Sequence, residues 1–114
     1  MKSSEFSPGI MPLFLRQSNS GIILIPKRIY YEWSRFLIPD LEYLNGRGAE
    51  LFLLPPFSSV EKAEEFCFLF FDLFFQHELR KCTTDPAFWP VNRTWEMFLE
   101  WFEVKIAEKV SVLK

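Results

Sequence analysis

The 114-residue chain has only two cysteines and one histidine. Two cysteines cannot form the dense disulfide framework of a small secreted scaffold. Cys67 and Cys82 also lack the Cys-x-x-Cys spacing of a zinc site, and with His77 they supply three ligands at most. This scarcity excludes a disulfide scaffold, and we expect no metal ion and no other cofactor.

The chain also lacks a large excess of charge of either sign. It has 13 lysines and arginines against 15 aspartates and glutamates, for a net charge of −2. Its basic residues do not form the clustered face that binds a phosphate backbone. Glycine-rich phosphate loops, a serine nucleophile elbow and a recognisable pair of catalytic carboxylates are absent from the sequence. We therefore expect no nucleic-acid partner and no enzymatic activity.

No apolar run in the sequence is long enough to cross a membrane. The densest run, residues 66–75, is half of the roughly 20 residues that a spanning helix needs, and Asp72 interrupts it. The N-terminus lacks the apolar stretch of a secretory signal. These patterns predict a cytoplasmic protein without membrane contact, in which both cysteines stay reduced.

Aromatic residues are abundant, with 14 phenylalanines, four tryptophans and three tyrosines. Because 49% of the residues are hydrophobic, the composition indicates a globular domain and not a disordered chain. Residues 1–19 mix serine, proline and glycine with a short apolar patch, which predicts a partly disordered N-terminal arm. Residues 20–114 are predicted to form a single α+β domain.

Three segments have the patterns of β-strands. Residues 22–25 and 50–54 are short apolar runs, each stopped by a proline. Over residues 102–112 apolar and polar side chains alternate, and the alternation breaks only at Glu108. Such alternation is typical of a strand with one buried and one exposed face.

Helical periodicity fills the segments between these strands. Apolar residues recur at helical spacing over residues 29–37 and 95–102, and Asn92 or Thr94 can cap the second of these helices. Asp85 followed by Pro86 is typical of the start of a short helical turn. Together with a long helix that ends near Lys81, these segments predict a small, mostly antiparallel three-stranded sheet packed against one long aromatic-rich helix and two shorter helices.

The long helix is the most informative segment. Ser58 and Glu61 match a capping box at its start. Its apolar side chains form two stripes, of which the first contains Ala63, Phe66, Phe70, Leu73 and His77 and the second contains Phe68, Phe71, Phe75 and Leu79. A helix that is apolar around most of its circumference is either buried or in contact with a partner. We therefore predict a partner-binding surface of aromatic side chains. Its residues are Phe68, Phe71, Phe75, Trp89 and Trp101.

His77 and Cys82 are the residues on which an enzymatic alternative rests. A single histidine near carboxylates can act as a general base, and the basic residues that precede Cys82 would favour its thiolate. The simpler interpretation is a histidine at the polar end of an apolar helix and two structural cysteines, with Cys67 in the core.

Three stretches of the sequence are distinctive. They are Ile25-Pro26-Lys27-Arg28-Ile29-Tyr30, then Pro56-Phe57-Ser58-Ser59-Val60-Glu61-Lys62-Ala63-Glu64, then Trp89-Pro90-Val91-Asn92-Arg93-Thr94 with Phe98 and Trp101-Phe102. On these residues the chain resembles, over roughly residues 22–112, a group of small uncharacterised bacterial proteins encoded in mobile gene regions. The group has no established catalytic residues, and its long helix is more polar than the one here. The resemblance implies a setting in which immunity and defence proteins are frequent.

These observations lead to three functional hypotheses. The first is a non-enzymatic protein-binding module, in its most specific form an immunity protein that neutralises a bacterial toxin by occlusion, since an acidic binder is steered toward a basic partner. The second is a homodimeric structural protein whose surplus phenylalanines form the dimer interface. The third is a small enzyme that depends on Cys82 and His77.

Overall fold

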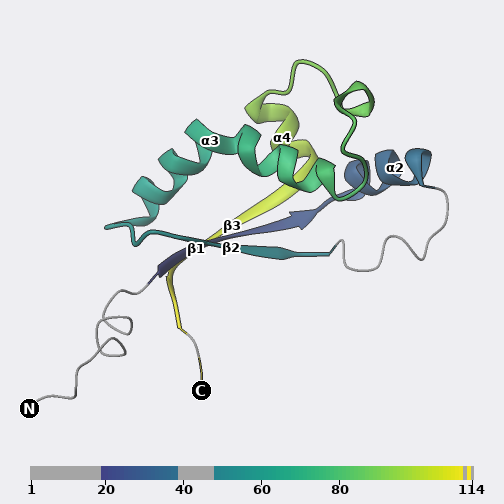
Figure 1. Ribbon diagram of the computed structural model, residues 1–114. Helices are drawn as coiled ribbons and strands as arrows, with labels where there is room; N and C mark the ends of the chain where they lie inside the picture. The colour runs from purple at the N-terminus through teal and green to yellow at the C-terminus, as the bar shows by residue number, and fades with distance from the viewer. Residues whose placement is uncertain (1–18, 39–47, 112, 114) are drawn as a thin grey trace, which may run out of the picture.

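The computed structural model describes residues 19–38, 48–111 and 113, which form a three-stranded sheet with helices on one of its faces (Figure 1). The elements follow one another as β1 (Asn19–Pro26), α2 (Arg28–Leu37), β2 (Glu50–Leu54), α3 (Val60–Arg80), the 3₁₀ helix η2 (Pro86–Phe88), α4 (Trp95–Trp101) and β3 (Phe102–Val110). This arrangement confirms the predicted α+β fold. The predicted N-terminal arm, apart from Asn19, lies outside the described residues.

β1 is the central strand of the sheet and pairs in antiparallel fashion with β2 on one side and β3 on the other. Ile22 lies opposite Phe52 of β2 and Ile106 of β3, so these three side chains share the face that the helices cover. Ile22 and Leu24 are fully buried beneath the helices. Within the described residues, no helix combines the length and hydropathy needed to cross a bilayer.

The break in alternation at Glu108 is a β-bulge. The register between β1 and β3 shifts between Asn19 and Gly21, which places an extra residue in β3. The hydroxyl of Ser20 donates to the carbonyl of Glu108 at 2.9 Å and accepts the backbone N–H of Phe57 at 3.0 Å. This buried serine therefore fixes the bulge and the chain that leads into α3.

α3 begins one residue later than the sequence predicts. The hydroxyl of Ser59, and not that of Ser58, accepts the backbone N–H of Lys62 at 3.2 Å. Both serines are chemically able to cap, but it is Ser59 that has the extended backbone of an N-cap, with φ −159° and ψ 163°. The helix is kinked at Phe70, where φ is −119° and ψ is 20°, and this residue separates an N-terminal half (60–69) from a C-terminal half (71–80).

One buried stripe attaches α3 to the sheet, where the sequence predicts two apolar stripes. The buried residues are Ala63, Cys67, Phe74, Phe75, Glu78 and Leu79. The stripe runs between the two predicted ones and takes residues from both, because the arc that faces the sheet is set by packing and not by the apolar pattern alone. Phe68, Phe70 and Leu73, which belong to the predicted stripes, are exposed.

Aromatic side chains fill the core between α3, α4 and the start of β3. The ring centroid of Phe75 lies 5.6 Å from that of Phe98, 5.4 Å from Trp101 and 5.7 Å from Phe102. Tyr30 of α2 extends this cluster, with its ring centroid 5.2 Å from that of Phe102. Tilted and edge-on contacts of this kind stabilise a core beyond the area that they bury.

The segment before α4 contains the predicted helix caps. Asp85 caps η2, and Thr94 caps α4 through its hydroxyl. Asn92, the other candidate cap, has φ 53°, in the left-handed region that asparagine tolerates better than most residues. The predicted helix over residues 95–102 ends at Trp101, since Phe102 is already extended and begins β3.

Candidate functional site

A groove of about 510 Å³ lies between α3, α4 and β3. Most of its lining is apolar and comes from all three elements. The apolar lining residues are Cys67 and Phe68 of α3, Trp95 and Leu99 of α4, and Val104 and Ile106 of β3. Glu61, Glu64 and Glu65 from the first turns of α3 complete the lining. The groove therefore has an apolar floor and an acidic rim along one side.

The groove is formed because α4 is much shorter than α3. α4 has seven residues, and Trp95 at its start contacts the rings of Phe68 and Phe71, with centroid distances of 5.4 and 6.0 Å. The N-terminal turns of α3 continue beyond this contact and extend past α4 over the sheet (Figure 1). The groove lies beside the face of α4 that presents Trp95 and Leu99.

An ion pair holds α4 in this position. The guanidinium of Arg93 donates to both carboxylate oxygens of Asp72, at 2.7 and 3.1 Å, and holds the pKa of Asp72 below its usual value. The same guanidinium lies 5.6 Å from the ring centroid of Trp89. Trp89, Arg93 and Thr94 of the distinctive Trp-Pro-x-Asn-Arg-Thr stretch thus connect the loop before α4 to the middle of α3.

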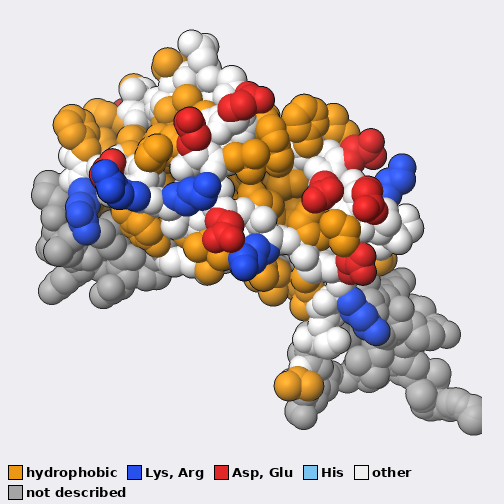
Figure 2. Space-filling view, turned by 180° about the vertical axis from the view of Figure 1, so that it is seen from behind, with side chains coloured by type: hydrophobic (Ala, Val, Ile, Leu, Met, Phe, Trp, Pro, Cys, Tyr) orange, Lys and Arg blue, Asp and Glu red, His pale blue; other side chains and the backbone are white. Residues whose placement is uncertain are grey.

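The acidic rim is only weakly neutralised. Glu61, Glu64 and Glu65 are all exposed, and none of the nine lining residues is basic. Lys62 lies 3.8 Å from Glu65, but an exposed pair at that distance contributes little. Figure 2 shows hydrophobic side chains lying among acidic ones on the side of the molecule opposite to the view of Figure 1.

A second exposed apolar surface, here termed the outer ridge, consists of Leu69, Phe70 and Leu73 of α3. Their exposed fractions are 65%, 43% and 64%. The ridge includes the kinked residue, and its members lie roughly 100° to 200° around the helix from Phe68. α3 therefore exposes apolar side chains in two directions, toward the groove and away from it.

The structure divides the five residues predicted to contact a partner. Phe68 lines the groove and is 52% exposed, and Phe71 and Trp89 are half-buried. Phe75 and Trp101 are 0% and 8% exposed in the core, so a partner cannot reach them in the folded protein. For these two residues the aromatic pattern indicates the core and not a binding surface. Aromatic side chains are frequent in both, so the pattern alone does not distinguish them.

Sequence reasoning did not identify the rest of the groove. The periodicity places Leu99 on the packed side of its helix with Trp95 and Phe98, whereas Leu99 is 36% exposed in the structure. The feature of the sequence that could have indicated the acidic rim is the spacing of Glu61, Glu64 and Glu65. This spacing puts three carboxylates on one side of a helix beside Phe68.

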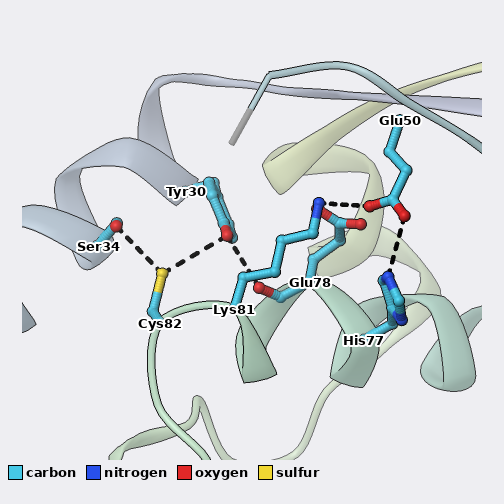
Figure 3. Close-up of polar contacts among 7 residues, drawn as sticks. All are labelled: Tyr30, Ser34, Glu50, His77, Glu78, Lys81 and Cys82. Carbon is cyan, nitrogen blue, oxygen red and sulfur yellow. Dashed lines mark hydrogen bonds and ion pairs between the residues drawn. The ribbon is translucent and has the colours of Figure 1, made fainter. Parts of the chain in front are cut away.

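Four ionisable side chains meet at the other end of α3 (Figure 3). Glu50 comes from the start of β2, and His77, Glu78 and Lys81 come from the last turns of α3 and its C-cap. Glu50 Oε2 is 3.0 Å from His77 Nε2. Lys81 Nζ lies 3.0 Å from Glu78 Oε1 and also pairs with Glu50 Oε1. The cluster joins an edge strand of the sheet to the end of the helix.

The two carboxyl groups of this cluster have opposite pKa shifts. Burial, followed by a hydrogen bond with Glu50, raises the pKa of Glu78 to about 7. Burial acts in the same direction on Glu50, but hydrogen bonds with Glu78, Lys81 and His77 and the charge of Lys81 bring the pKa of Glu50 down to about 2. In weakly acidic solution Glu78 is thus the carboxyl group of the pair that keeps its proton, and Glu50 is the one that is ionised.

Glu50, His77 and Glu78 also form the one group of described residues with the donor atoms for a metal ion, all within 4.8 Å of one another. However, the ammonium of Lys81 already pairs with both carboxylates. The cluster therefore balances its charge with its own side chains, and it acts as an ion-pair network that fastens β2 to α3.

His77 and Cys82 have different partners in the structure. Cys82 Sγ is 3.1 Å from Ser34 Oγ and 3.5 Å from the hydroxyl oxygen of Tyr30, whereas His77 bonds to Glu50. Figure 3 shows Cys82 and His77 on opposite sides of the cluster. The two residues named in the enzymatic alternative are therefore not arranged as a nucleophile and its base.

Comparison with known proteins gives no functional assignment, because no family model, curated protein or solved structure matches the chain. The resemblance to bacterial proteins of mobile gene regions thus stays a prediction. The function has to be argued from the groove, the outer ridge and the charges around them.

Proposed function

We propose that the chain is a non-enzymatic protein-binding module that contacts its partner through the exposed apolar side chains of α3. The observation that carries this proposal is the exposure of Phe68, Leu69 and Leu73, at 52%, 65% and 64%. These residues lie on one helix, next to a core that other aromatic side chains already fill. Large apolar side chains exposed on one helix, in the groove and on the outer ridge, are typical of an interaction site.

In its most specific form, the proposal is an immunity protein that neutralises a bacterial toxin by occluding its surface. The net charge of −2 and the acidic rim support this form, since a basic toxin would be attracted to them over several ångströms. The proposal includes a cytoplasmic location. Both cysteines are free, as expected in a reducing compartment.

Photo-cross-linking tests the proposal at the level of single residues. A photoreactive phenylalanine analogue would replace Leu69 in the full-length protein, expressed in its host cell. The matched control carries the analogue at Phe36 of α2, which is 84% exposed but lies on a different element. We expect a discrete cross-linked protein from position 69 and none from position 36. Equal cross-linking at both positions, or none at either, would contradict the proposal.

A homodimer is the second candidate, and the outer ridge favours it. A row of Leu69, Phe70 and Leu73 from one copy can pack against the same row of another copy across a two-fold axis. Sedimentation at micromolar concentration distinguishes the candidates. A dimer that the paired change Leu69→Glu and Leu73→Glu dissociates would support self-association, and a monomer would exclude it.

A further inference from the structure

We propose that the groove between α3, α4 and β3 binds a positively charged amphipathic segment of the partner protein. An apolar side chain of that segment would enter between Phe68 and Leu99, and its lysine or arginine side chains would pair with the acidic rim. This inference rests on the proposed function and adds to it the chemistry of the partner and the surface that it occupies.

The floor of the groove suits an apolar side chain. The volume of about 510 Å³ falls within the roughly 300–1,000 Å³ of typical binding pockets. Val104 and Ile106 form a half-buried base on the sheet, and Phe68 is held by its edge-on contact with Trp95. Because these side chains are already fixed by the fold, an entering residue would displace water at little cost in ordering the protein.

The rim selects the charge of the segment. Glu61 lies in the first turn of α3, where the helix dipole favours a carboxylate whether or not a partner is bound. Glu64 and Glu65 lie one turn further along, so their position does not have this local explanation. The neighbouring α4 adds Glu96 and Glu100, both exposed, and contains no basic residue. Glu96 and Glu100 do not line the groove themselves, so a cationic segment would pair first with the rim on α3.

A second copy of this chain is a poorer occupant than a different protein. The adjacent basic residues that follow β1 are already engaged within the monomer. Lys27 Nζ donates to the carbonyl of Leu99 at 2.7 Å, and Arg28 pairs with Glu32 at 2.9 Å. The exposed pair of Arg28 and Glu32 costs little to break, so it is the hydrogen bond of Lys27 that a second copy would have to give up and a foreign segment would not.

Two helical peptides provide the probe. Both have the same leucine positions, and their polar positions are all lysine in one and all glutamate in the other. With the full-length protein labelled for amide NMR, we expect the lysine peptide to shift the Trp95 indole and the backbone amides of Leu99 and Val104. We expect the glutamate peptide to shift none of them, since the rim repels it.

Variants of the rim test the charge directly. The paired change Glu64→Gln and Glu65→Gln should weaken binding of the lysine peptide about fivefold to tenfold at low salt, as measured by calorimetry. The matched control is Glu103→Gln. Glu103 is exposed on β3 next to Val104, and the alternation of the strand turns it away from the groove. This control should bind the peptide like the wild type.

Three outcomes would overturn the inference: equal binding of both peptides, shifts confined to residues outside the groove, or no binding of either peptide. Its failure can be separated from that of the proposed function. If neither peptide binds while position 69 still cross-links to a partner, the inference fails and the protein-binding module stands. If the cross-link is also absent, both fail.

Discussion

The two halves of α3 have similar amounts of aromatic residues and use them differently. In the C-terminal half, Phe74, Phe75 and Leu79 face the sheet and are buried. In the N-terminal half the buried positions belong to Ala63 and Cys67, which are small, while Phe66 is half-buried and Phe68 and Leu69 are exposed. The kink at Phe70 lies between the halves.

This difference shows that aromatic abundance alone does not measure the size of a core. Because small residues take the fully buried positions of the N-terminal half, Phe68 is left exposed beside the groove, while Phe66 packs only partly against the core. We infer that the C-terminal half of α3 supplies most of the packing against the sheet, and that the N-terminal half, together with Leu73, provides the binding surface.

The largest difference that we expect between the two halves of α3 is in how much a lost phenylalanine lowers the stability of the protein. Phe75→Ala should lower the free energy of unfolding by about 3–5 kcal/mol, because it leaves a cavity among Phe98, Trp101 and Phe102. Phe68→Ala should cost less than about 1 kcal/mol, since Phe68 is 52% exposed. Urea denaturation of both variants measures the difference. Similar losses would show that the two halves do not differ in this way.

A smaller effect concerns the ion-pair network at the end of the C-terminal half. Because the pKa of Glu78 is raised from 4.5 to about 7, the folded protein holds a proton that the unfolded chain releases, so this group makes stability fall as pH rises from 4.5 to 7. The lowered pKa of Glu50, about 2, makes stability rise between pH 2 and 4.5. The pair therefore predicts a stability maximum near pH 4.5.

Glu78→Gln isolates the contribution of this carboxyl. Glutamine resembles the protonated carboxyl in shape and stays neutral, so the fall between pH 4.5 and 7 should disappear in the variant. Between pH 5 and pH 8 the free energy of unfolding of the variant should rise by on the order of 2 kcal/mol relative to that of the wild type. Chemical denaturation at several pH values provides the comparison. Parallel pH profiles for the two proteins would contradict the raised pKa of Glu78.

The start of the N-terminal half gives a third, smaller effect. Ser59→Ala should lower stability by about 1 kcal/mol, because it removes the hydrogen bond to the backbone N–H of Lys62. Ser58→Ala is the matched control, and it should have little effect. Thermal unfolding measures both. A larger loss of stability for Ser58→Ala would show that Ser58 caps α3, as the sequence predicts.

The smallest expected effect concerns the enzymatic alternative. Cys82→Ala and His77→Ala should both keep the biological activity of the protein, whatever assay reports it, because the two side chains have separate partners. Loss of activity in both variants, with folding intact by circular dichroism, would revive a Cys- and His-dependent reaction.

The sequence predicts the fold well where local chemistry decides. Residues 50–54 are predicted and observed as a strand, Asp85 and Thr94 are the caps that their side chains allow, and Glu108 marks a bulge. β1 and β2 end at or next to prolines, and α3, η2 and α4 begin at residues whose side chains cap them, so these boundaries need no tertiary information. α2 is different, because it begins after Lys27 without a side-chain cap.

The candidate site is predicted only in part, because tertiary packing decides it. An apolar run around most of a helix does not specify which arc faces the sheet, so Phe68 and Phe75 look alike in sequence although one is exposed and the other buried. Likewise, the contact between Glu50 and His77 joins a strand to a helix 27 residues later in the sequence, and no local sequence pattern predicts it.

The salt dependence of peptide affinity tests whether the N-terminal half of α3 binds a cationic partner. Affinity of the lysine peptide would be measured by calorimetry over a range of ionic strength, for the wild type and for the variant with Glu64→Gln and Glu65→Gln. We expect a steep loss of affinity with salt for the wild type and a shallower loss for the variant, because added ions screen the exposed rim. Identical salt slopes for the two proteins would contradict the assignment of the N-terminal half of α3 to binding a cationic partner.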